Sequence, residues 1–301
     1  MEPVISIIIA HFNCVDLLQR LLQSIGLHND VEVIVVDDKS TQDLNKWAVC
    51  KAKYEGSQFW FLENTTKTKG AGVSRNMGLA QARGQWLLFA DADDVFVTDW
   101  YQVVQKYIHC QADIIYFKPS GESTRHKPYE LLVEAYLKGE QGAENKLRLQ
   151  FVPPWSKLIK RSLILREGIG FDDTLYSNDV MFSTKTGFYA QGITASQEVI
   201  YRLLEAPDSL TKDKNFDALY IRNEVLCRTY QFLRSHLSKK EFKKAYIRNF
   251  PLVNIHVMLK RKYGCKNFLK MYQLYRRYGV PVLASSNFNF KKIIRYLRKH
   301  F

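Results

Sequence analysis

The sequence predicts a doubly wound α/β domain followed by a basic helical region. Short apolar runs rich in β-branched residues recur in the first hundred residues and are bounded by polar residues, as expected for parallel strands buried on both faces. Helical periodicity appears between these runs, and alternating strands and helices are typical of α/β sheets. Net charge then changes sign along the chain. We therefore predict one domain over residues 1–211 and a second region over residues 212–301.

The predicted elements follow in order. Four strands are expected, at Ile5–Ile9, Glu32–Val36, Phe59–Leu62 and Trp86–Ala90. A helix lies between the first two strands because five apolar residues fall at one-three-four spacing, namely Leu17, Leu18, Leu21, Leu22 and Ile25. A second helix, at about Ala71 to Ala82, precedes the fourth strand. In such sheets ligands bind outside the carboxyl ends of the strands.

Polar clusters stand at three of these carboxyl ends, at Ala10–Asn13, Asp37–Asp38 and Asp91–Asp94. Asp91 and Asp93 are two residues apart, so both can reach one side of the segment. Neighbouring carboxylates repel each other, and a hard cation such as Mg²⁺ or Mn²⁺ takes oxygen ligands of this kind. The alternative interpretation is an acidic turn or a helix N-cap.

No glycine-rich dinucleotide or phosphate loop follows the first strand. Gly70-Ala71-Gly72 lacks both the following Lys-Ser/Thr and the preceding strand that a phosphate loop requires. This disfavours NAD enzymes and P-loop NTPases. The charge of a bound diphosphate would therefore have to be met by a metal ion and side chains, which gives the Asp91–Asp94 segment a purpose.

Four segments occur together in a characteristic order and spacing: Ile5–Asn13, Val35–Thr41, Gly72–Ala80 and Gly84–Asp94. Two more follow, the Trp-x-Lys-Leu element in Val152–Leu158 and an element resembling Glu-Asp-x-x-Phe that ends at Phe182. In these residues the chain resembles the glycosyltransferase family 2 enzymes, over residues 3–211. Linked motifs of this kind are far more specific than any one of them.

The resemblance implies a GT-A fold, a Rossmann-like mixed sheet flanked by helices. It also implies an inverting glycosyltransferase that moves a sugar from a nucleotide-sugar donor, most often a UDP-sugar, to a hydroxyl of a cell-surface glycan. The acceptor hydroxyl displaces the nucleotide directly. No covalent enzyme nucleophile is then needed, which agrees with the absence of an activated Ser or Cys motif.

The same resemblance implies roles for individual residues. Asp38 corresponds to the residue that contacts the nucleotide base, and Asp93 corresponds to the ligand of Mn²⁺ or Mg²⁺. Asp179 corresponds to the catalytic base. The other nucleotide- and donor-binding candidates are Ala10, His11, Asn13, Arg75, Asn76, Asp91 and Ala92, and the acceptor-side candidates are Trp155, Lys157 and Asn178. Arg202 and Lys212 are further candidates for the diphosphate.

Each assignment has a simpler alternative. Asp179 follows Ser177 and precedes an apolar helical run, so it also fits a helix N-cap or first-turn position. Lys157 also fits a side chain whose stem packs on Trp155. Arg75 and Asn76 also fit solvated helix positions, and His11 a packed residue at a strand end.

The chain departs from the family pattern at two places. Where the family has Pro-x-Tyr-Asn, this chain has Ala10-His11-Phe12-Asn13, which loosens the expected turn at the base pocket. Where the family has Glu-Asp, this chain has Asn178-Asp179. Because an asparagine side chain cannot take a proton, the base is assigned to Asp179 alone.

Charge is unevenly distributed. Residues 211–301 contain 22 Lys and Arg against 4 Asp and Glu, whereas residues 1–210 contain 22 against 26. Such asymmetry indicates an anionic partner for the C-terminal region. Its last stretch predicts an amphipathic helix with one apolar face, formed by Phe290, Ile293, Ile294, Leu297 and Phe301, and basic residues elsewhere. This pattern is typical of helices that lie in a membrane interface.

The C-terminal region has two alternative interpretations. It also fits a solvated helical region packed on its own domain, or a tail that binds nucleic acid non-specifically. No zinc-finger, RNA-recognition or helix-turn-helix pattern occurs, so no specific nucleic acid is expected. A lipid-linked or phosphate-rich glycan acceptor accounts for both halves of the chain.

The cysteines bear on location. The five, Cys14, Cys50, Cys110, Cys227 and Cys265, are far apart and contain no CxxC spacing, as expected for reduced cytosolic thiols. No cleavable signal or run of about eighteen apolar residues is found. We expect a cytoplasmic enzyme associated peripherally with the inner face of the cell membrane. The competing classes are a non-catalytic nucleotide-sugar-binding protein and a nucleic-acid-binding protein.

Overall fold

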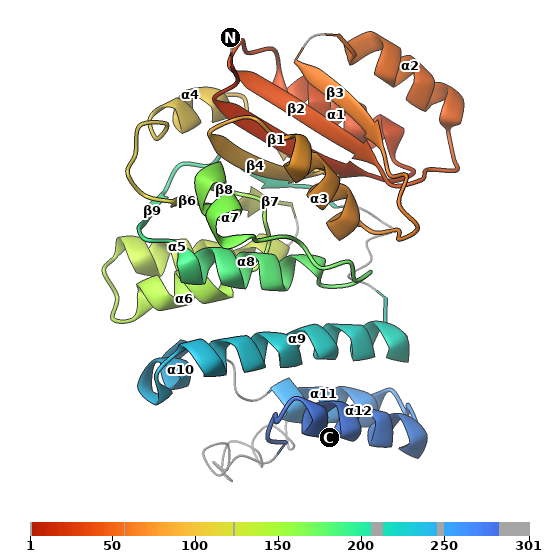
Figure 1. Cartoon of the computed structure of the whole chain (residues 1–301), viewed down its shortest axis with the longest axis vertical. Helices are drawn as coiled ribbons and strands as arrows, with labels where there is room; N and C mark the ends of the chain where they lie inside the picture. Colours follow the sequence, from red (N-terminus) through yellow and green to blue (C-terminus); the bar gives the residue numbers. More distant parts are fainter. Residues whose placement is uncertain (1, 57, 123, 206–212, 246–249, 283–301) are drawn as a thin grey trace. The chain divides into compact units, whose positions relative to one another are not determined.

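The computed structural model describes residues 2–56, 58–122, 124–205, 213–245 and 250–282 (Figure 1). The chain divides into two compact units, residues 1–212 and 213–301. We describe each unit by itself and call them the first unit and the second unit.

A seven-stranded mixed sheet forms the centre of the first unit. Its strand order is β3-β2-β1-β4-β8-β6-β9, with β4–β8 and β8–β6 antiparallel and the other pairs parallel. The strands are β1 (Ile5–His11), β2 (Val31–Asp37), β3 (Phe59–Glu63), β4 (Trp86–Asp91), β6 (Ile114–Phe117), β8 (Lys157–Lys160) and β9 (Ile193–Ser196). This confirms the predicted α/β class with a mixed sheet.

Helices flank the sheet in Figure 1. They are α1 (Val15–Ile25), α2 (Leu44–Tyr54), α3 (Ala71–Gln81), α4 (Trp100–Gln105), α5 (Lys127–Leu137), α6 (Ala143–Gln150), α7 (Arg161–Glu167) and α8 (Asn178–Tyr189). α3 lies close to β1 because Gly78 has no side chain. A Cβ there would lie 2.7 Å from Ile8 Cγ2.

A small second sheet lies beside the large one. Its order is β5-β10-β7, formed by β5 (Val95–Phe96), β10 (Tyr201–Leu203) and β7 (Ser120–Gly121). A 3-10 turn follows β7 at Thr124–His126. The small sheet brings the end of the first unit back to the segment just after β4, where the acidic residues stand.

The predicted strands are confirmed, but β1, β2 and β4 each continue beyond their apolar residues. Backbone pairing extends to Ala10 opposite Asp91 and to His11 opposite Asp37. The sequence pattern underestimated these ends because it followed side-chain polarity, whereas the ladder depends on backbone groups. The polar clusters therefore belong to one carboxyl edge of the sheet.

The second unit is helical. It contains α9 (Phe216–His236), α10 (Lys239–Ala245), α11 (Phe250–Lys260) and α12 (Cys265–Arg277). α9 begins at Asn215, whose side-chain oxygen accepts a hydrogen bond from the Ala218 N–H at 2.6 Å, an N-cap contact. Buried side chains of α9, α11 and α12 form its core, including Cys227, Met258, Met271, Leu274 and Tyr275.

The helical character predicted for this region is confirmed by α9 to α12. Lys212 and the predicted amphipathic segment of residues 290–301 lie outside the described residues. Within the part of the chain that the structure describes, none of the helices combines the length and the apolar character needed to cross a membrane.

Candidate active site

The end of β2 holds two adjacent carboxylates, Asp37 and Asp38, which we call the base-side pair. Asp37 accepts hydrogen bonds from His11 Nδ1 at 2.8 Å and from the Ser40 hydroxyl at 2.6 Å. Burial raises the pKa of Asp37, but the hydrogen bonds from His11 and Ser40 outweigh it and hold the pKa below its ordinary value. Asp37 is therefore a satisfied structural anion.

His11 is buried and hydrogen-bonded to Asp37, and its predicted contact to the nucleotide stays a prediction. Its Nε2 accepts the Cys14 N–H at 3.3 Å while Nδ1 binds Asp37, which a neutral imidazole satisfies at both nitrogens. Its ring stacks on Trp47 with centroids 4.8 Å apart. The structure thus favours the packed strand-end interpretation of His11.

Asp38 is buried and bonded at both oxygens. Oδ1 accepts from Asn64 Nδ2 at 2.7 Å, and Oδ2 accepts from the Gly70 N–H at 2.8 Å. Asn64 and Gly70 were not anticipated, because both contacts join residues far apart in the sequence. Its predicted contact to a nucleotide base stays a prediction, and the bonds show that its orientation is fixed before any ligand binds.

The turn after β1 is tied to the turn after β2. Asn13 has a φ of +51° and accepts hydrogen bonds from the Thr41 and Gln42 N–H groups, at 2.8 and 3.1 Å. Asparagine tolerates this left-handed conformation better than most residues. Beside Asn13, Phe12 is exposed and Lys69 Nζ lies 3.3 Å from its ring centroid. Ala10, at the end of β1, is half-buried.

Arg75 links two parts of the site. From α3, its Nη2 donates to Asp91 Oδ1 at 2.6 Å and its Nη1 to Asn178 Oδ1 at 2.8 Å. Only 7% of the residue is exposed, so it is not a solvated helix position. Its guanidinium group joins the end of β4 to the start of α8.

Asn76, one position further along α3, holds the loop that precedes α8. Its Nδ2 donates to the Phe171 carbonyl at 2.9 Å, and its Oδ1 accepts the Phe171 N–H at 2.8 Å. Phe171 in turn stacks on Phe182 of α8, with centroids 3.9 Å apart. Both polar groups of Asn76 are thus used in positioning this loop, and a contact of Asn76 to the donor stays a prediction.

Three carboxylates stand at and just after the end of β4, and we call Asp91, Asp93 and Asp94 the acidic cluster. Each offers an oxygen, and these oxygens lie within 4.8 Å of one another, while Ala92 between them is buried. Burial and the charge of Asp91 raise the pKa of Asp93. Burial and its two neighbours raise the pKa of Asp94 to about 8. Crowded anionic oxygens of this kind fit a hard divalent cation.

Asp94 also anchors the small sheet. It accepts hydrogen bonds from the Tyr201 hydroxyl at 2.9 Å and from the Leu204 N–H at 2.9 Å. Asp94 was assigned no separate role from the sequence, since its partners Tyr201 and Leu204 lie 107 and 110 positions later. Arg202, next to Tyr201, is exposed, and its Nη2 lies 3.7 Å from Glu122 Oε1.

Asp179 lies in the first turn of α8, one residue after Asn178. Burial raises its pKa, and the positive charges of Arg75 and Lys157 partly oppose this effect. The first-turn interpretation is confirmed, and it is compatible with a role as base. A carboxylate with a raised pKa binds a proton more readily than an ordinary one, as a general base must.

The acceptor-side candidates are largely buried. Trp155 is enclosed by the rings of Tyr129, Phe151 and Tyr201. Lys157 Nζ donates to the Phe151 carbonyl and to Ser183 Oγ, and it lies over the Phe151 ring. Burial lowers the pKa of Lys157 to about 7, and acceptor contacts by these residues stay predictions.

Taken together, the first unit contains the hydrogen-bonded base-side pair and the acidic cluster at the carboxyl edge of the sheet, and the candidate base Asp179 at the start of α8. Arg75 connects the last two. Asn76 and His11 support this arrangement through backbone and carboxylate contacts. Carboxylates of these two kinds can bind a divalent cation and accept a proton.

The chain is similar in sequence to known proteins. The sequence profile of glycosyl transferase family 2 matches residues 6–166. A poly(ribitol-phosphate) beta-glucosyltransferase of Bacillus spizizenii is 30% identical over 217 residues, covering 68% of this chain and 32% of that protein. The chain therefore spans about a third of the length of this relative.

Two solved structures share the fold. Staphylococcus aureus TarS, residues 1–349 in complex with UDP-GlcNAc, has a TM-score of 0.65 at 20% identity, over 80% of this chain and 69% of that chain. A mannosyltransferase of Pyrobaculum calidifontis in complex with GDP-Man and Mn²⁺ has a TM-score of 0.61 at 17% identity, over 92% and 82%. Since the family profile covers more than half of the sequence, this chain belongs to glycosyl transferase family 2.

Proposed function

We propose that this protein is an inverting glycosyltransferase that moves a sugar from a UDP-sugar to a hydroxyl of a cell-envelope glycan. The observation that carries the proposal is the bridge made by Arg75 between Asp91 and Asn178. It joins the end of β4, where the donor is expected, to the turn that holds Asp179. The buried guanidinium group of Arg75 would thus fix the position of the base relative to the donor.

Asp179 is proposed as the base. An acceptor hydroxyl attacks the anomeric carbon, the bond to the nucleotide diphosphate breaks, and the hydroxyl proton passes to the Asp179 carboxylate. A positioned base contributes about 10²–10⁴-fold to such a step. The raised pKa of Asp179, caused mainly by burial, supports this role.

Asp93 is proposed to hold Mg²⁺ or Mn²⁺, with Asp91 and Asp94 beside it. A bound divalent cation would neutralise the negative charge that develops on the diphosphate. The Mn²⁺ in the mannosyltransferase of the same fold supports the choice of cation. Asp38, with Ala10 and Asn13 nearby, is proposed to receive the nucleotide base.

The donor is tested by calorimetric titration of UDP, GDP and CMP, each with and without Mn²⁺. We expect UDP to bind and to need Mn²⁺. The UDP-GlcNAc bound by TarS supports a uridine nucleotide. Failure of all three nucleotides to bind would contradict the proposal.

The acceptor is proposed to be a phosphate-rich or lipid-linked glycan. Poly(ribitol-phosphate), which the Bacillus relative is named for, is an acceptor of this anionic kind. The excess of 22 basic over 4 acidic residues in positions 211–301 supports an anionic partner at the cytoplasmic face of the membrane. Deleting residues 287–301 should weaken binding to anionic vesicles without affecting nucleotide binding.

One observation favours a second candidate, a nucleotide-sugar-binding protein without turnover. Asn178 stands where the family has an acid, and it is occupied by Arg75. Donor consumption, followed as UDP release with and without acceptor extracts, separates the two candidates. Metal-dependent UDP binding without any release would favour the second.

A further inference from the structure

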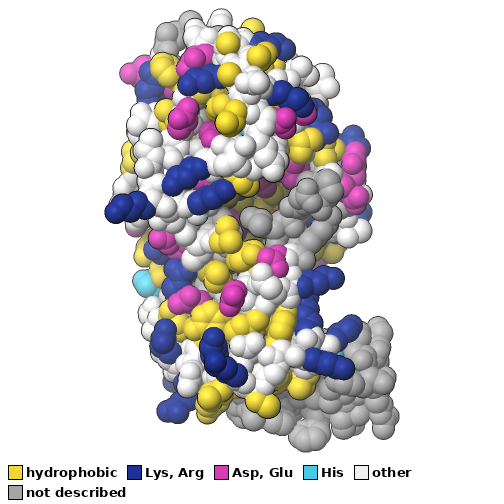
Figure 2. Space-filling view, turned by 90° about the vertical axis from the view of Figure 1, so that its right-hand side faces the viewer, with side chains coloured by type: hydrophobic (Ala, Val, Ile, Leu, Met, Phe, Trp, Pro, Cys, Tyr) yellow, Lys and Arg dark blue, Asp and Glu magenta, His cyan; other side chains and the backbone are white. Residues whose placement is uncertain are grey.

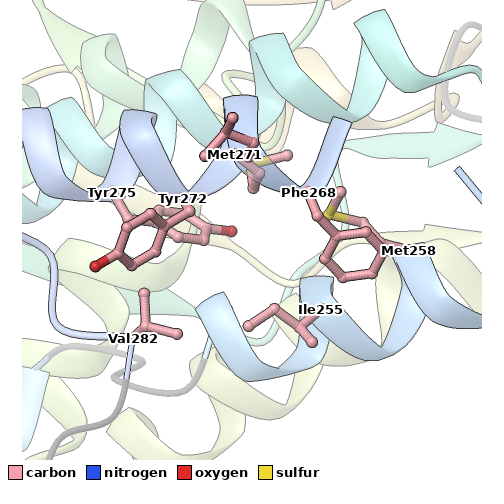
Figure 3. A pocket seen from close by; sticks show the side chains of 8 residues that line it. Ile255, Met258, Phe268, Met271, Tyr272, Tyr275 and Val282 are labelled. Atoms are coloured by element: carbon pink, nitrogen blue, oxygen red, sulfur yellow. The ribbon is translucent and has the colours of Figure 1, made fainter. Parts of the chain in front are cut away.

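An apolar pocket lies between α11 and α12 in the second unit (Figure 3). Its volume is about 330 Å³, and its lining is apolar and aromatic: Ile255, Met258, Phe268, Leu269, Met271, Tyr272, Tyr275 and Val282. Figure 3 shows the side chains of both helices pointing into the space between them. No residue of the proposed transferase site contributes to it.

The rim of the pocket is exposed. Leu269 is 57% exposed and Tyr272 is 50% exposed, and both line the pocket. Among the described residues of the second unit, the exposed large hydrophobic side chains all fall on α11 and α12, with Val253 and Leu259 as the others. These two helices therefore present an apolar surface that continues into a cavity.

The segment that contains these two helices carries basic but no acidic residues. Residues 250–282 contain no Asp or Glu, and their seven basic residues are all exposed: Lys260, Arg261, Lys262, Lys266, Lys270, Arg276 and Arg277. Figure 2 shows hydrophobic and basic side chains next to each other on the surface of the second unit. An exposed apolar patch edged by cations is typical of surfaces that enter the headgroup region of an anionic membrane.

We propose that the α11–α12 surface binds an anionic bilayer, and that its pocket takes one acyl chain of an anionic phospholipid. This inference deepens the membrane association suggested under the proposed function, and it places the contact on described residues outside the segment 290–301. Lys266 and Lys270 would meet lipid phosphates, while Leu269 and Tyr272 enter the apolar layer.

A polyanionic glycan is the rival partner for this surface. It would interact with the lysines and arginines but would gain nothing from an apolar cavity or from exposed leucines. The apolar lining therefore favours lipid. The two partners also differ in the residues on which their binding depends.

The test is sedimentation of the full chain with vesicles of phosphatidylglycerol or of phosphatidylcholine, in the absence of donor. We expect binding to phosphatidylglycerol only, reduced about tenfold or more in the double variant Leu269→Ser with Tyr272→Ser. Leu131→Ser is the matched control, since Leu131 lies on α5 of the first unit and is 62% exposed. Equal binding by the double variant and the control would overturn the proposal and favour a purely electrostatic, glycan-type surface.

Insertion of a chain into the pocket has its own readout. All five tryptophans of the chain lie at or before residue 155, in the first unit. Tyr272→Trp adds one at the pocket, and phosphatidylglycerol brominated on its acyl chains should quench that added fluorescence but not the fluorescence of the unmodified protein. Vesicle-bound Tyr272→Trp without extra quenching would overturn the pocket assignment.

UDP titration of the same preparations keeps the two proposals apart. Loss of vesicle binding with normal UDP binding would concern only the α11–α12 surface. Normal vesicle binding with no UDP binding would concern only the transferase site.

Discussion

The site contains two sets of aspartates, and they differ in whether the protein supplies hydrogen bonds that stabilise their negative charge. In the base-side pair, Asp37 and Asp38 receive hydrogen bonds at each oxygen from groups already in place. In the acidic cluster and at Asp179, burial and like charges raise the pKa values of Asp93, Asp94 and Asp179. The base-side pair has its hydrogen-bond partners in place and holds a fixed geometry. The carboxylates with raised pKa values carry unfavourable negative charge, which a cation, a proton or a ligand can neutralise.

The strongest test of this difference is Asp179→Asn. The amide keeps the shape but cannot accept the proton, so sugar transfer should fall by about 10²–10⁴-fold. UDP affinity should stay the same. Asp173→Asn, on the exposed loop before α8, is the control and should leave both unchanged. Unchanged transfer in Asp179→Asn would refute its role as base.

Asp93→Asn tests the acidic cluster. Removing this charge should abolish the part of UDP affinity that depends on Mn²⁺, a loss of about tenfold or more, equivalent to about 1.4 kcal/mol. Asp99→Asn, at a nearby exposed position, should retain it. Calorimetry with and without chelator measures both, and chelator sensitivity that persists in Asp93→Asn would sink the assignment.

Lys157→Met tests whether a buried lysine makes the free energy of unfolding depend on pH. The pKa of Lys157 is lowered by burial to about 7, well below its ordinary value near 10.5. Between these values the unfolded chain binds the proton more tightly than the folded chain, so this lysine makes stability rise with pH, by at most about 1.4 kcal/mol per pH unit. Below pH 7 the contribution is constant.

The measurement for Lys157→Met is urea unfolding from pH 6 to pH 10, read as the difference from the unmodified protein. We expect the rise to disappear in this variant and to persist in Lys160→Met. Lys160 lies on the same strand as Lys157, and its Nζ donates to the Gln111 carbonyl. Parallel pH curves for Lys157→Met and the unmodified protein would show that Lys157 does not titrate in this range.

Asp37→Asn tests the base-side pair. Losing a charged acceptor for His11 should lower the free energy of unfolding by about 1.5–3 kcal/mol at pH 7. Because the pKa of Asp37 is below its ordinary value, its contribution is present above pH 4 and is lost as pH falls through the folded pKa. Acid unfolding of the variant should therefore depend less on pH, and a steeper dependence would contradict this account.

Asn178→Asp should have the smallest effect. It keeps the acceptor for Arg75 and adds a negative charge beside Asp179, which should raise the pKa of the base. We expect the acidic limb of the transfer rate to move to higher pH, with less than about a tenfold change at its maximum. A large loss at all pH values would indicate that the neutral amide itself is required.

Much of the site follows from local sequence, and the rest depends on distant contacts. Strands β1 to β4, helices α1 and α3, and the polar clusters at β1, β2 and β4 were predicted because periodicity and chain order determine them, whereas β5 to β10 were not predicted. The partners Asn64, Phe171 and Tyr201 were not, since each bond spans at least 26 positions. Aromatic packing around Trp155 was hidden for the same reason, because a Trp-x-Lys-Leu pattern does not show whether its ring faces solvent or core.

Gly72 carries a consequence for anyone redesigning this protein. A Cβ at this position would lie 2.0 Å from the Asp172 carbonyl oxygen and 2.8 Å from Asn178 Cβ, so α3 and the start of α8 touch through bare backbone. Arg75 and Asn76 stand within the next turn and contact the same partner segment. Replacing residues 168–179 with those of a relative would therefore require α3 to be replaced together with them.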